Sequence, residues 1–219
     1  MNIARLKVLG SNYIGLFGIT NDKLCFVPES IEERAVKTIE NTLNVKTKQV
    51  SIYSSALLAV FAKMNNKHVY LPSFASQKEI EQIEKEIKVK IIKTQNALGN
   101  LIELNDAGAI ISKTLPKKAT EEIKKSGLNV LQTNVAGIEV TGSGIVATNK
   151  GFLINPRATK EEALLVEKTL GVKGGSSTAN TGDALVRNSI LANVHGFLIG
   201  ETTTPHEINR IEEALEGQA

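Results

Sequence analysis

The stretch from Leu16 to Pro28, which reads Leu-Phe-Gly-Ile-Thr-Asn-Asp-Lys-Leu-Cys-Phe-Val-Pro, decides the fold. An apolar run ends at Asn21, a short turn follows, and a second apolar run ends at Pro28. Asn and Asp tolerate the positive φ angles that tight hairpin turns require, and proline ends strands because it lacks an N–H. The stretch therefore predicts a β-hairpin.

The same pattern recurs along the whole chain. An asparagine that closes an apolar run and opens a turn stands at Asn21, Asn65, Asn105, Asn149 and Asn193, with spacings of 44, 40, 44 and 44 residues. The second strands of the hairpins are predicted at Leu24–Val27, Val69–Leu71, Ala109–Ile111, Phe152–Ile154 and Phe197–Ile199. Repeats of this length are supersecondary units that bury their apolar faces against one another. The chain is thus predicted to contain five such units.

A helix is predicted after each hairpin. Four helix starts read as capping boxes, in which a hydroxyl and a carboxylate three residues later each satisfy a free backbone N–H. The pairs are Ser30 with Glu33, Ser76 with Glu79, Thr159 with Glu162 and Thr204 with Glu207. Apolar residues then follow at helical spacing, as in Ile208, Ile211 and Leu215. The helix of the third unit, residues 117–126, is predicted to be short and weakly capped.

A third strand is predicted after each of the first four helices, at Val50–Tyr53, Lys90–Thr94, Asn129–Thr133 and Val172–Thr178. The fifth unit lacks one, while the alternating segment Ile3–Val8 stands alone at the N-terminus. We infer that this segment completes the fifth unit and closes a ring, which removes exposed sheet edges. The prediction is one domain, 1–219, with units at 11–54, 55–95, 96–135, 136–180 and 181–219 plus 1–10. Such ββαβ-like units in a closed circle describe a pentein-type α/β propeller.

Composition excludes several classes of protein. The chain has 219 residues, of which 42% are hydrophobic and 22% charged, and a net charge of +3. No apolar segment approaches the roughly 20 residues that span a bilayer, and the N-terminus lacks the pattern of a secretory signal. The single cysteine, Cys25, fits a reducing compartment, so a cytoplasmic location is predicted. The mild charge permits contact with RNA without requiring it, and no Cys/His cluster has metal-ligand spacing.

One motif resembles a known family. The run from Asn96 to Asn100 contains the Ala-Leu-Gly-Asn signature of the archaeal and eukaryotic translation initiation factor six family, and the segment from Gly196 to Thr204 is also similar. The resemblance implies a protein that binds the intersubunit face of the large ribosomal subunit, on a ribosomal protein beside the sarcin–ricin loop. It further implies that the protein blocks joining of the small subunit and takes part in large-subunit maturation. Eukaryotic members carry a long C-terminal tail, whereas this sequence stops at Ala219, soon after the last predicted helix. An archaeal-type member is therefore expected.

The same resemblance implies a binding protein without cofactor, catalytic residues, DNA or membrane partner, expected to act as a monomer. Asn100 matches the family residue at the ribosomal interface. The positions equivalent to it in the other repeats are expected to be Leu16, Val60, Gly144 and Asn188, all near one end of the ring. The full set of expected ribosome-binding residues is Asn100, Leu98, Gly99, Tyr13, Ser55, Leu57, Ser143, Arg187 and Asn188. Alternatively, Asn100 only hydrogen-bonds backbone in its own turn.

Two other functions are weighed against this one. Pentein folds also include enzymes that modify guanidino groups with a cysteine nucleophile, which makes Cys25 a candidate. Cys25 lies between Leu24 and Phe26 in a predicted strand, where a free cysteine is usually a small buried apolar residue. No histidine is placed by the sequence to activate it. The third possibility is an assembly scaffold that binds another complex through the same end of the ring.

Overall fold

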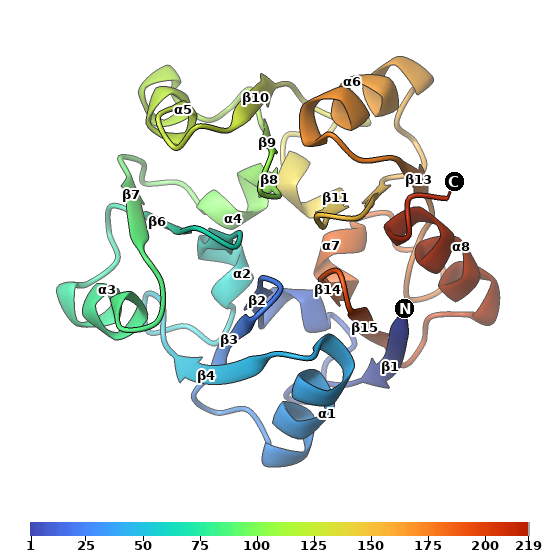
Figure 1. Ribbon diagram of the computed structural model, residues 1–219, viewed down its shortest axis with the longest axis horizontal. Helices are drawn as coiled ribbons and strands as arrows, with labels where there is room; N and C mark the ends of the chain where they lie inside the picture. Colours follow the sequence, from blue (N-terminus) through green and yellow to red (C-terminus); the bar gives the residue numbers. More distant parts are fainter. Residues whose placement is uncertain (219) are drawn as a thin grey trace.

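The computed structural model describes residues 1–218, which form fifteen strands, eight α-helices and two single helical turns around a central axis (Figure 1). The strands form five three-stranded sheets within this range. They are β2 (Ile19–Thr20), β3 (Leu24–Pro28) and β4 (Lys46–Val50); β5 (Lys63–Met64), β6 (Val69–Pro72) and β7 (Val89–Ile92); β8 (Ile102–Leu104), β9 (Gly108–Ile111) and β10 (Asn129–Gln132); β11 (Ile145–Ala147), β12 (Phe152–Ile154) and β13 (Gly174–Ser176); and β14 (Ile190–Ala192), β15 (Gly196–Gly200) and β1 (Asn2–Leu6). In each sheet the first two strands form an antiparallel hairpin and the third lies parallel to the middle one.

A longer helix connects the second strand to the third in each repeat. These helices are α1 (Glu33–Leu43), α3 (Gln77–Glu84), α5 (Lys117–Lys124), α6 (Lys160–Leu170) and α8 (Pro205–Leu215). They lie on the outer rim of the ring (Figure 1). Each turns an apolar stripe inward: Ile39 and Leu43 of α1 are buried, as are Val166 and Leu170 of α6. No helix within residues 1–218 is long and apolar enough to cross a membrane.

The N-terminal strand closes the ring, as predicted. β1 pairs with β15 in parallel register from Asn2 opposite Gly196 to Leu6 opposite Gly200. The N-terminal amine of Met1 also contacts Glu212 of α8 and Glu216, the residue that follows α8, each at 3.1 Å. The architecture is therefore the pentein-type α/β propeller of five pseudo-symmetric units. Ala219, the last residue of the predicted fifth unit, lies outside the described residues.

Two local predictions were wrong. The third strand of the first unit is β4 at Lys46–Val50, not Val50–Tyr53, because Asn44 ends α1 with a positive φ of 51° and the chain extends at once. The capping box predicted at Ser30 and Glu33 does not form, since α1 begins at Glu33 after Glu32, which makes no side-chain cap. The other three capping boxes are present, and α5 has no side-chain cap, as expected.

The hairpin turns share one hydrogen-bond pattern, which corrects the repeat register in the fourth unit. Asn21 Oδ1 accepts hydrogen bonds from the N–H groups of Lys23 and Leu24, both at 2.8 Å. Asn65, Asn105 and Asn193 do the same in their turns. In the fourth unit the acceptor is the Thr148 hydroxyl, not Asn149. The residue equivalent to Asn100 in that unit is therefore Ser143 rather than Gly144.

The turn asparagines also connect neighbouring units. The side-chain amide of each asparagine donates to the backbone carbonyl of the equivalent residue in a neighbouring unit, at 3.0–3.1 Å. The four bonds run from Asn193 to Asn21, from Asn21 to Asn65, from Asn65 to Asn105, and from Asn105 to Thr148. Thr148 has no amide, so the direct chain of bonds stops at the junction between the fourth and fifth units. Buried polar groups joined in this way fix the relative position of the units.

The closing strand yields a stability prediction with an internal control. The N–H of Asn2 donates to His195 O at 3.0 Å, and in a parallel ladder every second residue of a strand points its N–H toward the same neighbour. Ala4 thus donates toward β15, whereas the N–H of Arg5 points away from it. Ala4→Pro should lower the free energy of unfolding by about 1–3 kcal/mol, because it removes a ladder bond, and Arg5→Pro should cost clearly less. Equal losses in denaturant titrations would contradict the pairing.

Candidate functional site

A ring of five single-turn helices surrounds the axis, one before the first strand of each unit. They are η1 (Ile14–Leu16), α2 (Leu58–Phe61), α4 (Leu98–Leu101), η2 (Thr141–Ser143) and α7 (Val186–Ser189), and each contacts its two neighbours (Figure 1). Asn100 lies in α4, the helical turn that precedes β8. One helical turn is too short to show a periodic pattern, so the sequence offered no signal for it.

Small residues allow these turns to approach each other closely. The equivalent positions are Gly15, Ala59, Gly99 and Gly142 in the first four units. A Cβ atom on Gly99 would lie 1.9 Å from Ala59 O, and one on Gly15 would lie 1.9 Å from Arg187 O. Gly99 is therefore a packing residue between α2 and α4. Gly99 is buried inside the ring, and its contact with a partner stays a prediction.

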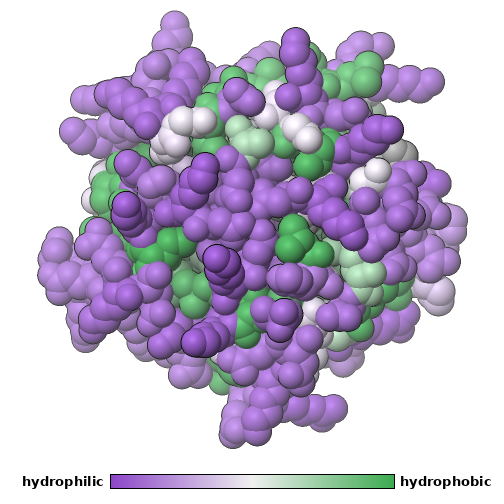
Figure 2. All heavy atoms as spheres, viewed as in Figure 1, coloured by the Kyte–Doolittle hydropathy of each residue, from purple (hydrophilic) through white to green (hydrophobic). Residues whose placement is uncertain are grey.

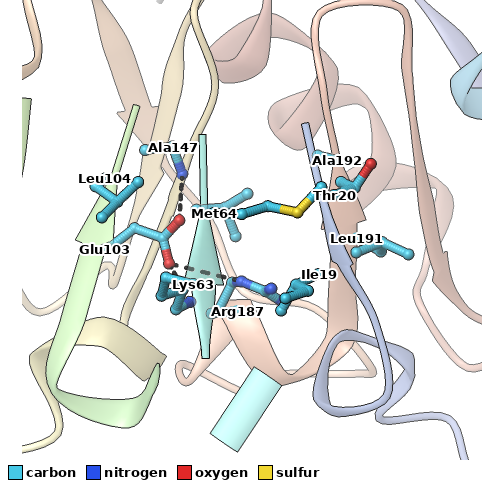
Figure 3. Close-up of a pocket in the computed structure, with 11 residues that line it drawn as sticks. Ile19, Thr20, Lys63, Met64, Glu103, Leu104, Ala147, Arg187, Leu191 and Ala192 are labelled. Atoms are coloured by element: carbon cyan, nitrogen blue, oxygen red, sulfur yellow. Dashed lines mark hydrogen bonds and ion pairs between the residues drawn. The ribbon is translucent and has the colours of Figure 1, made fainter. Parts of the chain in front are cut away.

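The fifth unit has Arg187 at this position, and its side chain fills the axis. The residue is only 8% exposed, and its guanidinium donates to Gly15 O at 2.6 Å and to Ile190 O at 3.1 Å. Its Nε lies 3.6 Å from the carboxylate of Glu103, which also pairs with Lys63 (Figure 3). Arg187 was expected at the docking surface because it lies next to Asn188, the residue equivalent to Asn100 in the fifth unit. The structure instead places it in the interior, where carbonyl groups and Glu103 compensate that charge.

The axial cluster of Lys63, Glu103 and Arg187 is structural in character. It borders a cavity of about 20 Å³, roughly the room for one water molecule. Burial lowers the pKa of Lys63 to about 8, with Arg187 acting in the same direction and Glu103 opposing it. Burial also lowers the pKa of Arg187. The cluster holds two cations and one carboxylate away from solvent, so Glu103 is the residue that makes this arrangement tolerable.

The outward side of the ring of helical turns forms a surface that we call the helical-turn face. The residues that precede the five turns belong to it, namely Tyr13, Leu57, Ala97, Val140 and Leu185. A residue near the end of a turn joins them in four units, namely Leu16, Val60, Asn100 and Asn188, while the equivalent Ser143 of the fourth unit is buried beneath the surface. None of these ten residues is charged. Tyr13 is 45% exposed and Asn100 is half-buried, with its Oδ1 accepting from the Ser143 hydroxyl at 3.4 Å.

The expected ribosome-binding residues divide into two groups. Tyr13 is exposed, and Asn100, Leu57, Asn188 and Ser55 are half-buried, so their side chains reach the surface. Leu98, Gly99, Ser143 and Arg187 are buried, and Leu98 belongs to the core beneath α4 with no exposed surface. The same one-turn helices that carry the exposed residues turn these four residues inward, and their contact with a partner stays a prediction.

The opposite end of the axis is polar. Each first strand runs from a helical turn to a hairpin turn, so the hairpin turns gather at the other end. Side chains of Asp22, Asn66, Asp106 and Asn149 form a closed circuit there, in which both amides donate to both carboxylates at 2.6–2.9 Å. In Figure 1 the hairpin turns of β2 and β14 lie in front of η1 and α7, and Figure 2 shows hydrophilic residues over most of the centre of this end.

Comparison with known proteins assigns the chain to a family. The eIF-6 family model matches residues 3–214. The chain belongs to the eIF-6 family. Similar proteins include the one named Translation initiation factor 6 from Pyrococcus horikoshii, which is 34% identical over 98% of this chain and 99% of its own length. Those of the same name from Thermoplasma acidophilum and Sulfolobus acidocaldarius are 31% and 32% identical over 97% and 98% of this chain, and over 99% of their own lengths.

Among solved structures, DDAH from Pseudomonas aeruginosa in complex with citrulline covers 94% of this eIF-6 family chain and 74% of its own, at 10% identity and a TM-score of 0.42. That likeness is too weak to bear on function. Cys25, the candidate nucleophile, is fully buried in β3, and burial raises the pKa of its thiol to about 12. A thiol in that state is not a nucleophile near neutral pH. Residues 1–218 contain no group of three or more His, Cys, Asp or Glu side chains that could hold a metal ion.

Three capping-box glutamates of this eIF-6 family chain also accept hydrogen bonds from the turns that precede the helical turns. Tight turns precede the helical turns and contain non-glycine residues with positive φ, among them Tyr53, Ala136 and Thr181. Glu79 accepts from the N–H of Ser54 at 3.1 Å, and Glu162 accepts from Ala136 at 3.1 Å. Glu207 accepts from Thr181 and Gly182. Each carboxylate thus caps a rim helix and holds a turn beside the helical-turn face.

The axial cluster gives a stability prediction. Glu103→Gln should lower the free energy of unfolding by about 3–5 kcal/mol, because it leaves two buried cations without a carboxylate. Lys63→Met should cost less, since Arg187 and Glu103 then form a one-to-one pair. The free energy of unfolding from urea titration measures both. A larger loss for Lys63→Met than for Glu103→Gln would contradict the role of Glu103 in compensating the two buried cations.

The capping carboxylates predict sensitivity to acid. Burial acts to raise the pKa of Glu207, but hydrogen bonds from Thr204, Thr178 and Gly182 hold the pKa below its ordinary value of 4.5, and Glu79 behaves likewise. A depressed folded-state pKa stabilises the protein above the unfolded value, and this stabilisation is lost as the pH falls through the folded value. Stability should therefore fall below about pH 4.5, and less steeply in Glu207→Gln. Exposed Glu213→Gln, the control, should keep the wild-type slope in unfolding measured from pH 6 to pH 3.

Proposed function

We propose that this protein is a translation initiation factor that docks its helical-turn face on the intersubunit face of the large ribosomal subunit and so prevents joining of the small subunit. The family match over residues 3–214 and the name of the relatives support the role in initiation. The observation that supports the site is the contrast between the two ends of the axis. The residues that form the helical-turn face are uncharged and several are apolar, while charged and amide side chains gather at the hairpin end.

Such a mechanism requires no chemistry. A rigid ring bound on a surface that a second large particle must touch excludes that particle by overlap. Stable binding needs an interface of about 1,600 Å² in total with a few well-packed anchors near its centre. The helical-turn face suits this because its residues are fixed to a closed ring and change little on binding. The partner surface that we propose is a ribosomal protein beside the sarcin–ricin loop, and a role in large-subunit maturation follows from the same docking.

Asn100 is the centre of the proposed contact. The Ser143 hydroxyl donates to its carbonyl oxygen in a long contact of 3.4 Å, which favours one orientation of the amide. The equivalent residues in the first two units, Leu16 and Val60, are apolar. An amide beside apolar residues provides direction as well as affinity, because a partner that leaves it unpaired loses the solvation of that group without a replacement hydrogen bond.

Subunit joining tests the function itself. Purified archaeal large subunits are incubated with saturating protein, small subunits are added, and joined ribosomes are resolved on sucrose gradients. We expect the large subunits to remain free. Undiminished joining at saturation would reject the proposal.

Asn100→Arg tests the site. A long cation on the uncharged face should weaken co-sedimentation with large subunits by at least about tenfold, the effect of losing a good interface contact. Asn209→Arg is the matched control, because Asn209 is exposed on the rim helix α8 and the substitution is the same. Both variants should melt near the wild-type temperature. A drop in melting temperature that parallels the loss of binding for Asn100→Arg would assign Asn100 a structural role instead.

A further inference from the structure

The turn at Tyr53 and Ser54 stands out among the turns that border the helical-turn face. Ser55 N–H donates to Ile52 O at 3.1 Å, and the two central residues have φ values of 56° and 51°. The corresponding turns Leu9–Gly10 and Ala136–Gly137 place glycine second, as such turns prefer. The turn in the second unit has no glycine. It therefore holds two side chains in the left-handed region, one of them a bulky aromatic, and Glu79 fastens it by accepting from Ser54 N–H.

The side chain of Tyr53 stands on two other aromatic rings. Its ring centroid lies 4.9 Å from that of Phe74 and 5.6 Å from that of Phe61, and Phe61 and Phe74 meet edge to face at 5.8 Å. Tilted and edge-to-face pairs are the favourable geometries for aromatic rings. Despite this packing, Tyr53 keeps 61% of its surface exposed. We call these three residues the aromatic triad.

The aromatic triad is continuous with the helical-turn face. Phe61 is the last residue of α2, the helical turn that carries Val60. The Ser55 hydroxyl accepts from Leu57 N–H at 3.0 Å, which ties the turn to the start of α2. A partner seated on the helical-turn face over the second unit would therefore reach Tyr53.

The charge around the triad indicates the chemistry of that partner. Residues 51–62 and 71–77, which carry all three rings, contain no Asp, Glu, Lys, Arg or His. Nucleic-acid surfaces are bound chiefly through cations that meet phosphates. An exposed tyrosine packed on other aromatic rings is instead typical of the anchors that dominate protein–protein interfaces.

We propose that Tyr53 is a preformed anchor that inserts against an uncharged, apolar patch of a protein of the large ribosomal subunit, extending the helical-turn face over the second unit. The inference rests on the proposed function, because it takes the large subunit as the partner. The left-handed turn and the two phenylalanines hold the ring in its binding orientation before contact. Little side-chain freedom is then lost on docking, which raises affinity for a given contact area.

Tyr53→Asn is the decisive variant. Asn removes the ring yet tolerates the left-handed conformation, so the turn should remain. We expect affinity for large subunits to fall at least about tenfold, whereas Tyr53→Phe, which keeps the ring, should bind within about twofold of wild type. Leu164→Ala is the control for loss of an exposed apolar side chain, because Leu164 is 65% exposed on the rim helix α6. Wild-type affinity in Tyr53→Asn would overturn the proposal.

A photo-crosslink separates protein from RNA as the contact. A benzophenone amino acid in place of Tyr53 should, on irradiation of the complex, join this chain to a ribosomal protein. A crosslink to rRNA alone would overturn the assignment of a protein partner. Failure of the proposed function is distinguishable, since the wild-type chain would then not sediment with large subunits at all. If wild type binds and Asn100→Arg weakens binding while Tyr53→Asn does not, only the present inference fails.

Discussion

The pairing of β1 with β15 is the constraint on which the rest of the ring depends. Without it, the fifth sheet has no third strand and β15 has an unpaired edge, which is prone to pairing with other chains. The central features all draw residues from several units: the axial cluster uses the second, third and fifth, and the turn asparagines form a chain from the fifth to the fourth. These contacts can form together only once the circle is closed, so closure converts five weak units into one cooperative structure.

Closure also explains why the two ends of the axis differ. At the hairpin end, the turns leave backbone N–H groups pointing inward, and Asn21 or its equivalents satisfy them, which fills that end with amides and carboxylates. At the helical end, the side chains of Ser11, Ser55 and Asp183 accept hydrogen bonds from N–H groups at the starts of the turns, and small residues such as Gly99 let the turns fit together. The residues of the helical-turn face itself carry no charge. An uncharged face suited to docking is thus a by-product of how the ring is packed.

The sequence predicts the repeating parts well and the singular parts poorly. Hairpins, rim helices and the closing strand follow from apolar periodicity and turn chemistry repeated five times, so errors in one unit are corrected by the others. The position of β4 was missed because Lys46 and Lys48 give an exposed edge strand no apolar pattern. The fourth turn was misplaced because Thr148 does the work of asparagine while Asn149 stands beside it. Arg187 was assigned to the surface because nothing local reveals that Glu103, 84 positions earlier in the sequence, will compensate it.

Function and fold make different demands on the turn between Ile52 and Ser55. A closed ring needs a tight turn between Ile52 and Ser55, and glycine would meet that need with least strain, as it does at Gly10 and Gly137. Tyr53 and Ser54 meet it with more strain, and Glu79 must hold the turn as well as cap α3. The Tyr53 ring packs on Phe61 and Phe74, yet most of its side chain faces solvent. The fold does not require this backbone strain, and the strain lies at an exposed aromatic residue beside an uncharged face. We attribute it to the binding of a surface outside the chain.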